Sequence, residues 1–252
     1  MVAIVQTSAR ATYPGSGGSG TTATNTLSGV TSGNLINTLN CAGGGPATTP
    51  TISVSDGTSY TQAAQMDYNY STSVYAMACG HFLPNVSSGT HTIVGTNNAG
   101  AFNCYGYMRS QEISGLATAS VLDTTIGTGG AITASGSGST VSLASSGTLG
   151  ETFGIFFCVA SISASSNITI TEPSGFTNVD SNSTAATFSD FALGSMDYQI
   201  FSSTAAITPS YGSVGSNLGW GMIGYALKAA AASGVKFRKT LSEIGGRVGT
   251  RQ

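Results

Sequence analysis

Two histidines are the first residues whose types and spacing could do chemistry. His81 lies in an apolar stretch before Phe82, and His91 follows a turn-forming segment, so a hairpin would bring the two imidazoles face to face. A protein zinc site needs three or four ligands, and only Cys79 is close enough in sequence to be a third. We therefore expect packed or surface histidines, no metal site and no other cofactor.

The acidic residues give little sign of catalysis. Ten Asp and Glu side chains are scattered through the chain, whereas general acid–base catalysis needs two titratable groups in unlike environments. A hydrolase built around a nucleophile elbow would carry Gly-x-Ser-x-Gly, and that pentapeptide does not occur. The sequence predicts a protein that is not an enzyme, and it offers no catalytic residue.

One acidic stretch has the pattern of a calcium loop. Asp180, Asn182 and Thr184 place side-chain oxygens at alternate positions, as calcium ligands are placed. However, Ala185 stands where such a loop has Gly, and Phe191 stands where it has Glu. We interpret the stretch as a polar loop.

Two tyrosines are candidates for sugar binding. Tyr68 and Tyr70 alternate with Asp67 and Asn69, and aromatic rings with polar neighbours are typical of carbohydrate sites. In the alternative interpretation, which we prefer, the two rings cap the edge of a β-structure. Trp220, between two glycines, is expected in the core or as an interface anchor.

The composition limits the class of protein. Charged residues make up 7% of the 252 residues, against roughly 25% in ordinary globular proteins. Hydrophobic residues make up 40%, with ten Phe and ten Tyr, which is enough for a core and excludes a disordered body. The length fits one all-β domain with an extension, and the low charge is unlike that of a solvated, monomeric cytosolic enzyme.

Basic residues are concentrated at the C-terminal end. Residues 1–227 carry two of them against nine acidic residues, whereas residues 228–252 carry six against one. The partner-docking residues predicted in this tail are Lys236, Phe237, Arg238, Lys239, Arg247 and Arg251. The basic charge is too dilute for a typical nucleic-acid-binding run, so we expect a protein partner and not nucleic acid.

The N-terminal segment and the apolar runs bear on where the protein is located. Met1–Arg10 lacks the basic and apolar regions of a secretory signal, so we expect that the chain either stays in the cell that makes it or leaves by another route such as lysis. No apolar run approaches the roughly 18 residues that cross a bilayer, so no membrane partner is expected.

The four cysteines show no metal-binding spacing; they are Cys41, Cys79, Cys104 and Cys158. This leaves buried free thiols or one or two disulfides.

Short alternating segments predict β-strands along the whole body. The strongest hairpin signal is Thr51–Thr61 around Asp56 and Gly57, since both residue types tolerate the backbone of a tight turn. Val74–Leu83 and Thr90–Thr96 are predicted to form the next hairpin. Glu151–Ile162 is almost continuously apolar, as a central strand would be.

The strand count favours an all-β fold made as an antiparallel two-sheet β-sandwich. We expect roughly nine to twelve strands in residues 1–228, followed by a linker and an extended basic assembly tail in residues 229–252. A parallel β-helix is the alternative, but no fixed-period repeat supports it.

Several short pieces occur in an order that resembles a known family. They are Gly33–Ile36, Ile52–Thr61, Pro84–Thr92, Glu112–Gly115 with Val121–Asp123, Pro173–Phe176 and Gly221–Lys228. Their order is similar to that in the jelly-roll-like β-sandwich domains of bacterial surface proteins and phage virion proteins. The resemblance implies a non-enzymatic module for display, adhesion or decoration, and it carries over no catalytic residue. The basic tail and the missing secretory signal favour a virion component over a surface adhesin, and such a component is made in the host cytoplasm and freed by lysis.

The sequence therefore predicts a structural accessory protein of a phage virion, either a capsid decoration or cement subunit or a tail-fibre-type subunit. Its expected partners are other virion proteins and copies of itself as a homo-oligomer. The alternative is a receptor-binding or glycan-binding adhesion module, in which Tyr68 and Tyr70 contact a sugar.

Overall fold

The computed structural model describes residues 1–14, 22–44, 51–71, 74–97, 104–164, 166–183, 193–215 and 219–231, and the regular structure in these ranges is β-strand throughout. The sixteen strands described are β1 (Ala3–Thr7), β2 (Ala11–Pro14), β3 (Thr22–Val30), β4 (Leu35–Gly44), β5 (Ile52–Ser55), β6 (Thr61–Ser71), β7 (Val74–Leu83), β8 (Gly89–Asn97), β9 (Cys104–Ser114), β10 (Ala131–Gly136), β11 (Thr140–Ser142), β12 (Gly154–Ser163), β13 (Thr177–Asn182), β14 (Leu193–Phe201), β15 (Ser210–Ser213) and β16 (Gly219–Lys228). Within these ranges, no helix is long and apolar enough to cross a bilayer.

The strands form four antiparallel sheets. Sheet I has the order β1-β9-β4-β7-β6, with β2 also paired to β9, and sheet II has the order β10-β16-β12-β14-β13. Sheet III is β3-β8-β5, and sheet IV is β11-β15. Because β1 to β9 make sheets I and III while β10 to β16 make sheets II and IV, each half of the chain folds into its own pair of sheets.

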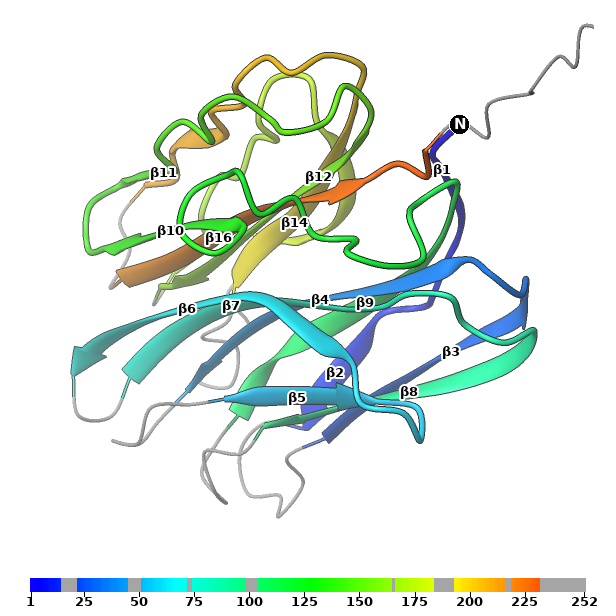
Figure 1. The fold of residues 1–252 in the computed structure, drawn as a ribbon. Coiled ribbons are helices and arrows are strands. Elements are labelled where there is room, and N and C mark those ends of the chain that lie inside the picture. The colour runs from blue at the N-terminus through cyan, green and yellow to red at the C-terminus, as the bar shows by residue number, and fades with distance from the viewer. Residues whose placement is uncertain are drawn as a thin grey trace, which may run out of the picture.

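The sheets are stacked in layers with sheet I in the middle. Sheet II contacts one face of sheet I, mainly through β12 and β16, and sheet III contacts the other face (Figure 1). Sheet IV contacts the outer side of sheet II through β11 and β16. The prediction of an all-β, antiparallel fold is confirmed, and the stacked sheets are consistent with a sandwich. The described residues form four sheets and not the two that were predicted, and sheets I and II are each covered on both faces.

Three apolar clusters fill the spaces between these layers. One, which includes Phe157 and Tyr225, lies between sheets I and II, and another, which includes Met77, lies between sheets I and III. The third covers the outer face of sheet II and includes Phe156 and Trp220. Since Phe156 and Phe157 are neighbours on one strand, they point to opposite faces of sheet II, which explains why β12 is buried along its whole length.

The contact between sheets I and II depends on a close approach. A Cβ atom at Gly80 on β7 would lie 2.4 Å from Cε1 of Tyr225, so the Tyr225 ring occupies the space that a larger residue would need. The buried hydroxyl of Tyr225 donates a hydrogen bond to Oδ1 of Asn37 at 2.7 Å. The aromatic ring thus crosses from sheet II to sheet I, and its polar end is satisfied there.

The turn predicted at Asp56 and Gly57 is present, but its flanking strands do not pair as a hairpin. The amide of Tyr60 donates to the carbonyl of Val54 at 2.9 Å, and Gly57 has a φ of 100°. Beyond the turn, β5 pairs with β8 in sheet III and β6 pairs with β7 in sheet I. The local sequence sets the turn, whereas the buried faces of the two strands set their partners.

Other strand predictions differ in detail. The alternation of Val2–Tyr13 predicts one strand, but the structure divides this segment into β1 and β2. β10, β13 and β15 were not predicted from the sequence. β7 and β8 also lie in different sheets, so the second predicted hairpin is wrong. Cys41, Cys79 and Cys158 are buried free thiols, whereas the side chain of Cys104 lies outside the described part of the structure.

Candidate docking site at the end of the body

The start of β12 lies between the ends of two neighbouring strands. β12 is antiparallel to both β14 and β16, and the register places Gly154 opposite Phe201 on one side and Lys228 on the other. A Cβ atom at Gly154 would lie 2.4 Å from the carbonyl oxygen of Leu227 and 2.5 Å from the Phe201 ring. The three strand ends therefore meet closely at this edge of sheet II.

The chain beyond β16 is held to the body for two more residues. The amide of Ala229 donates to the carbonyl of Phe153 at 3.1 Å, and the amide of Ala230 donates to the carbonyl of Gly115 at 2.8 Å. The N-terminus lies at the same place, because a Cβ atom at Gly115 would lie 2.2 Å from the carbonyl oxygen of Met1. Both the beginning and the end of the described chain thus lie beside the start of β12.

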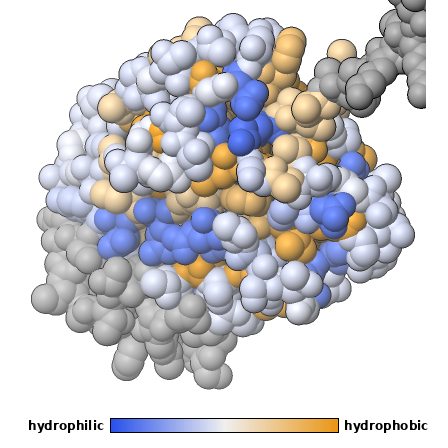
Figure 2. Space-filling view, in the orientation of Figure 1, coloured by the Kyte–Doolittle hydropathy of each residue, from blue (hydrophilic) through white to orange (hydrophobic). Residues whose placement is uncertain are grey.

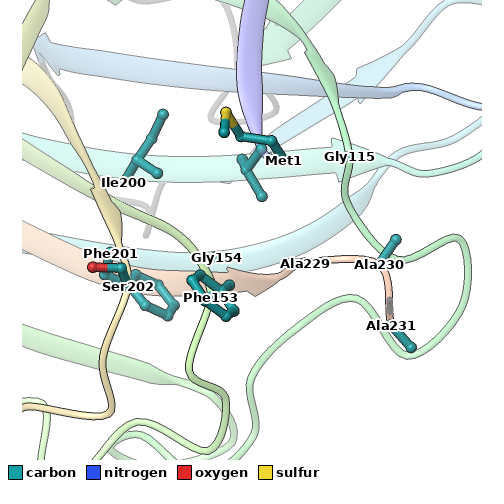
Figure 3. Close-up of a pocket in the computed structure, with 11 residues that line it drawn as sticks. Met1, Gly115, Phe153, Gly154, Ile200, Phe201, Ser202, Ala229, Ala230 and Ala231 are labelled. Carbon is teal, nitrogen blue, oxygen red and sulfur yellow. The ribbon is translucent and has the colours of Figure 1, made fainter. Parts of the chain in front are cut away.

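These segments enclose a pocket of about 740 Å³ with mainly apolar walls (Figure 3). Its lining residues are Met1, Val2, Gly115, Phe153, Gly154, Ile200, Phe201, Ser202, Ala229, Ala230 and Ala231. Figure 3 shows Met1, Ile200 and Phe153 around the open space, while the space-filling view shows apolar surface beside the point where the described chain ends (Figure 2).

The exposure of the pocket residues is unusual for this protein. Four large hydrophobic side chains are strongly exposed in the described ranges, namely Met1, Val5, Phe153 at 59% and Ile200 at 47%, and three of these line the pocket. A grouped apolar surface of this kind marks an interaction site more often than scattered exposed residues do. The pocket can bind apolar side chains, and it offers few polar groups to orient a polar substrate.

A smaller hollow of about 350 Å³ adjoins the pocket. It shares Ile200, Phe201 and Ser202 with the pocket, and it adds polar groups such as Gln199 and Thr208. The surface therefore changes from apolar to polar over a short distance.

Three charged residues of the body, Arg10, Arg109 and Asp180, form a separate cluster. Asp180 on β13 accepts hydrogen bonds from Nε of Arg10 at 2.8 Å and from Nε of Arg109 at 2.7 Å. Arg10 also lies over the ring of Tyr107, with 4.7 Å between its Cζ and the ring centroid. Burial alone would raise the pKa of Asp180, but the hydrogen bonds and charges of the two guanidinium groups outweigh it and hold the pKa below its ordinary value. The cluster links the edge of sheet II to the N-terminal segment and β9.

A second buried carboxylate has only neutral partners. Asp197 on β14 accepts hydrogen bonds from the Tyr211 hydroxyl at 2.5 Å, from Ser195 Oγ at 2.8 Å and from Asn178 Nδ2 at 2.9 Å. Burial raises its pKa, and the three hydrogen bonds offset that effect only in part. Every donor comes from the second half of the chain, so this cluster stabilises sheet II and its contact with sheet IV.

The histidines do not form the site considered in the sequence. His81 is buried in sheet I, and burial lowers its pKa to about 4, so the imidazole is neutral. His91 lies in sheet III, where its Nδ1 is 2.5 Å from Oδ2 of Asp56 and its Nε2 is 3.0 Å from the carbonyl oxygen of Ser87. No group of three metal-ligating side chains occurs in the part of the chain that the structure describes.

The other candidate site residues lie in different parts of the structure. The sequence predicts a polar loop for the calcium-like stretch, but Asp180 and Asn182 lie in strand β13, so that prediction is wrong at these two positions. Asp180 binds two arginines, and Thr184 lies outside the described residues. Tyr68 is partly buried, and a Cβ atom at Gly219 would lie 2.3 Å from its ring, so the ring packs on β16. The side chain of Tyr70 is outside the described residues.

The predicted tail residues also lie outside the described ranges; they are Lys236, Phe237, Arg238, Lys239, Arg247 and Arg251. The pocket itself was not predicted from the sequence. A partial signal exists in Phe153, which follows the polar residues Glu151 and Thr152, but the pocket needs five separate segments to assemble.

Comparison with known proteins does not extend this description. No family model matches the sequence, and no curated protein matches it. The function is therefore inferred from the residues of the body and of the pocket.

Proposed function

We propose that this chain is a non-enzymatic structural accessory protein of a phage virion, a head decoration or cement subunit or a tail-fibre-type subunit. The observation that carries the proposal is the apolar pocket at the point where the C-terminal segment leaves the body. In this proposal the body is a jelly-roll-like β-sandwich, and residues 229–252 include a basic tail that docks on an acidic neighbouring subunit.

Several properties of the body support an assembly role. Only 7% of the residues are charged, which suits extensive contacts between copies because burying an unpaired charge at an interface is costly. Sheets I and II are covered on both faces, so the body has a large apolar interior that does not depend on a partner. In the assembled particle, the exposed pocket is then a surface for other virion proteins or for further copies of this chain.

Particle composition tests the proposal. Mass spectrometry of purified particles from the phage that encodes this chain is expected to detect the full-length protein in many copies. A variant that lacks residues 234–252 is expected to fold normally but to be missing from the particles. Absence of the full-length protein would overturn the virion assignment, and normal incorporation of the truncated protein would overturn the role of the tail.

A further inference from the structure

The chain continues directly out of the wall of the apolar pocket. Ala229, Ala230 and Ala231 line the pocket, and the backbone amides of the first two are hydrogen-bonded to the body. Twenty-one further residues, 232–252, follow in the sequence. The nearest candidate occupant of the pocket is therefore the segment that begins at its own edge.

The first part of this segment has a suitable sequence. Val235 and Phe237 alternate with the charged residues Lys236 and Arg238, so in an extended conformation the two apolar side chains share one face. Val235 is four positions after Ala231, and an extended chain spans about 13 Å over that length. Gly234 tolerates the backbone conformations that reverse a chain. The segment can therefore return to the pocket that it leaves.

We propose that this pocket binds Val235 and Phe237 of the same chain. The two side chains lie against Phe153 and Ile200, whose exposed surfaces they cover. The outward-facing basic residues then lie near Glu151, an exposed carboxylate two residues before Phe153.

The point of attachment favours the segment of the same chain, over that of a second copy, as the occupant of the pocket. A short flexible connection gives the tethered segment an effective concentration in the millimolar range, well above the concentration of free copies in a dilute solution. Closing so short a loop also costs little entropy compared with bringing two molecules together. This inference concerns the free protein and does not depend on the proposed virion role.

A disulfide-trapping experiment tests the contact directly. The full-length chain carries Ile200→Cys and Phe237→Cys in a Cys104→Ser background, where the three remaining native thiols are buried. Mild oxidation is expected to link the two new cysteines within one chain, which is detected as a monomer on a non-reducing gel and as a linked peptide by mass spectrometry. The matched control pairs Phe237→Cys with Ser88→Cys, an exposed position in the turn before β8.

The expected rate of linkage is about tenfold higher for the pocket pair than for the control pair, because docking raises the local concentration of the two thiols. Equal rates for the two pairs would overturn the docking proposal. Preferential linkage between two chains would overturn the choice of occupant, since a second copy would then supply the segment.

Limited trypsin digestion of the full-length protein gives a second readout. Docking is expected to make cleavage after Lys236 and Arg238 about tenfold slower than cleavage after Arg247, because the protease acts on the undocked population. Phe153→Ser changes an exposed residue, so the body stays folded while the difference in cleavage rates disappears. Equal rates in the unmodified protein would contradict the proposal, whatever the protein's role in a particle.

Discussion

Asp180 and Asp197 are buried carboxylates on adjacent strands of sheet II, but their surroundings are opposite. Asp180 on β13 is paired with two guanidinium groups from the first half of the chain, whereas Asp197 on β14 accepts hydrogen bonds only from neutral groups of the second half. The comparison shows how a chain with little charge uses it. Both arginines of residues 1–227 pair with Asp180, and this cluster joins the first half of the chain to the second. Asp197 is stabilised instead by hydroxyl and amide dipoles.

The two carboxylates should therefore respond to pH in opposite directions. The pKa of Asp180 is lowered, so its contribution to stability is present above the unfolded-state pKa and is lost as the pH falls through the folded-state value. The pKa of Asp197 is raised, so the native state binds its proton more tightly than the unfolded state does. Protonation of Asp197 accordingly favours the folded state, and this gain is lost as the pH rises through the folded-state pKa.

The largest expected effect comes from removing the charge of Asp180. Asp180→Asn keeps the shape of the side chain but leaves Arg10 and Arg109 without their counter-charge. We expect the free energy of unfolding at pH 7 to fall by about 3 kcal/mol, the lower end for breaking a buried ion pair, because both arginines retain some contact with water. Urea denaturation at pH 7 measures this loss.

The pH dependence provides the control for this substitution. The difference in stability between the unmodified protein and Asp180→Asn should shrink as the pH falls through the folded-state pKa of Asp180, because the unmodified carboxylate also becomes neutral. A loss that stays constant down to strongly acidic pH would show that packing, and not charge, explains the effect.

A smaller effect is expected when Asp197 loses its shortest hydrogen bond. Tyr211→Phe keeps the buried ring and removes the hydroxyl that donates to Asp197 at 2.5 Å. We expect the free energy of unfolding to fall by about 2 kcal/mol at neutral pH, as is typical for a hydrogen bond to a charged group. Thermal or urea unfolding at pH 7 measures this change.

Tyr107→Phe is the matched control for that prediction. Tyr107 is also a buried tyrosine, but its hydroxyl donates to the neutral carbonyl of Gly194 at 2.9 Å. A loss of about 1 kcal/mol is expected there, since both partners are uncharged. If the two variants lose equal stability, Asp197 is not ionised in the native state at neutral pH.

The sequence predicts some of these features and not others, for physical reasons. Nearly continuous apolar runs identified β7 and the buried β12, because a strand that is covered on both faces is apolar along its length. The partners of β5 and β6 could not be predicted from their shared turn, since burial in different layers separates the two strands. The division of the sandwich into four sheets has the same cause.

The candidate sites show the same limit. The sequence singled out Asp180 because of a calcium-like pattern around it, but its partners Arg10 and Arg109 are distant in sequence. Their rarity was a usable signal, because Arg10 and Arg109 are the two basic residues of residues 1–227. With nine acidic residues in the same range, ion pairs that involve these two arginines could be expected. Asp197 and Tyr211 carry no such signal, and the pocket depends on segments from both ends of the chain.

The smallest expected effect concerns a third carboxylate, Asp56, whose partner His91 can lose its charge. The carbonyl oxygen of Ser87 and the carboxylate of Asp56 both accept hydrogen bonds, so the two ring nitrogens of His91 satisfy them together only when both are protonated. Burial alone would lower the pKa of His91, but these hydrogen bonds and the negative charges of Asp56 and Glu112 outweigh it and raise the pKa. The pair thus lies between the permanent ion pairs of Asp180 and the uncharged partners of Asp197.

His91→Gln is expected to lower the free energy of unfolding by about 1 kcal/mol at pH 5.5, and by less at pH 8.5. The raised pKa means that the contribution of His91 is fully present below the unfolded-state value of 6.5 and disappears as the pH rises through the folded-state value. Urea denaturation at the two pH values measures the difference, and Asp56→Asn should remove the same pH dependence. If His91→Gln costs equal stability at both pH values, the imidazole acts through packing or neutral hydrogen bonds, and Asp56 would belong with Asp197 among the carboxylates that have no cationic partner.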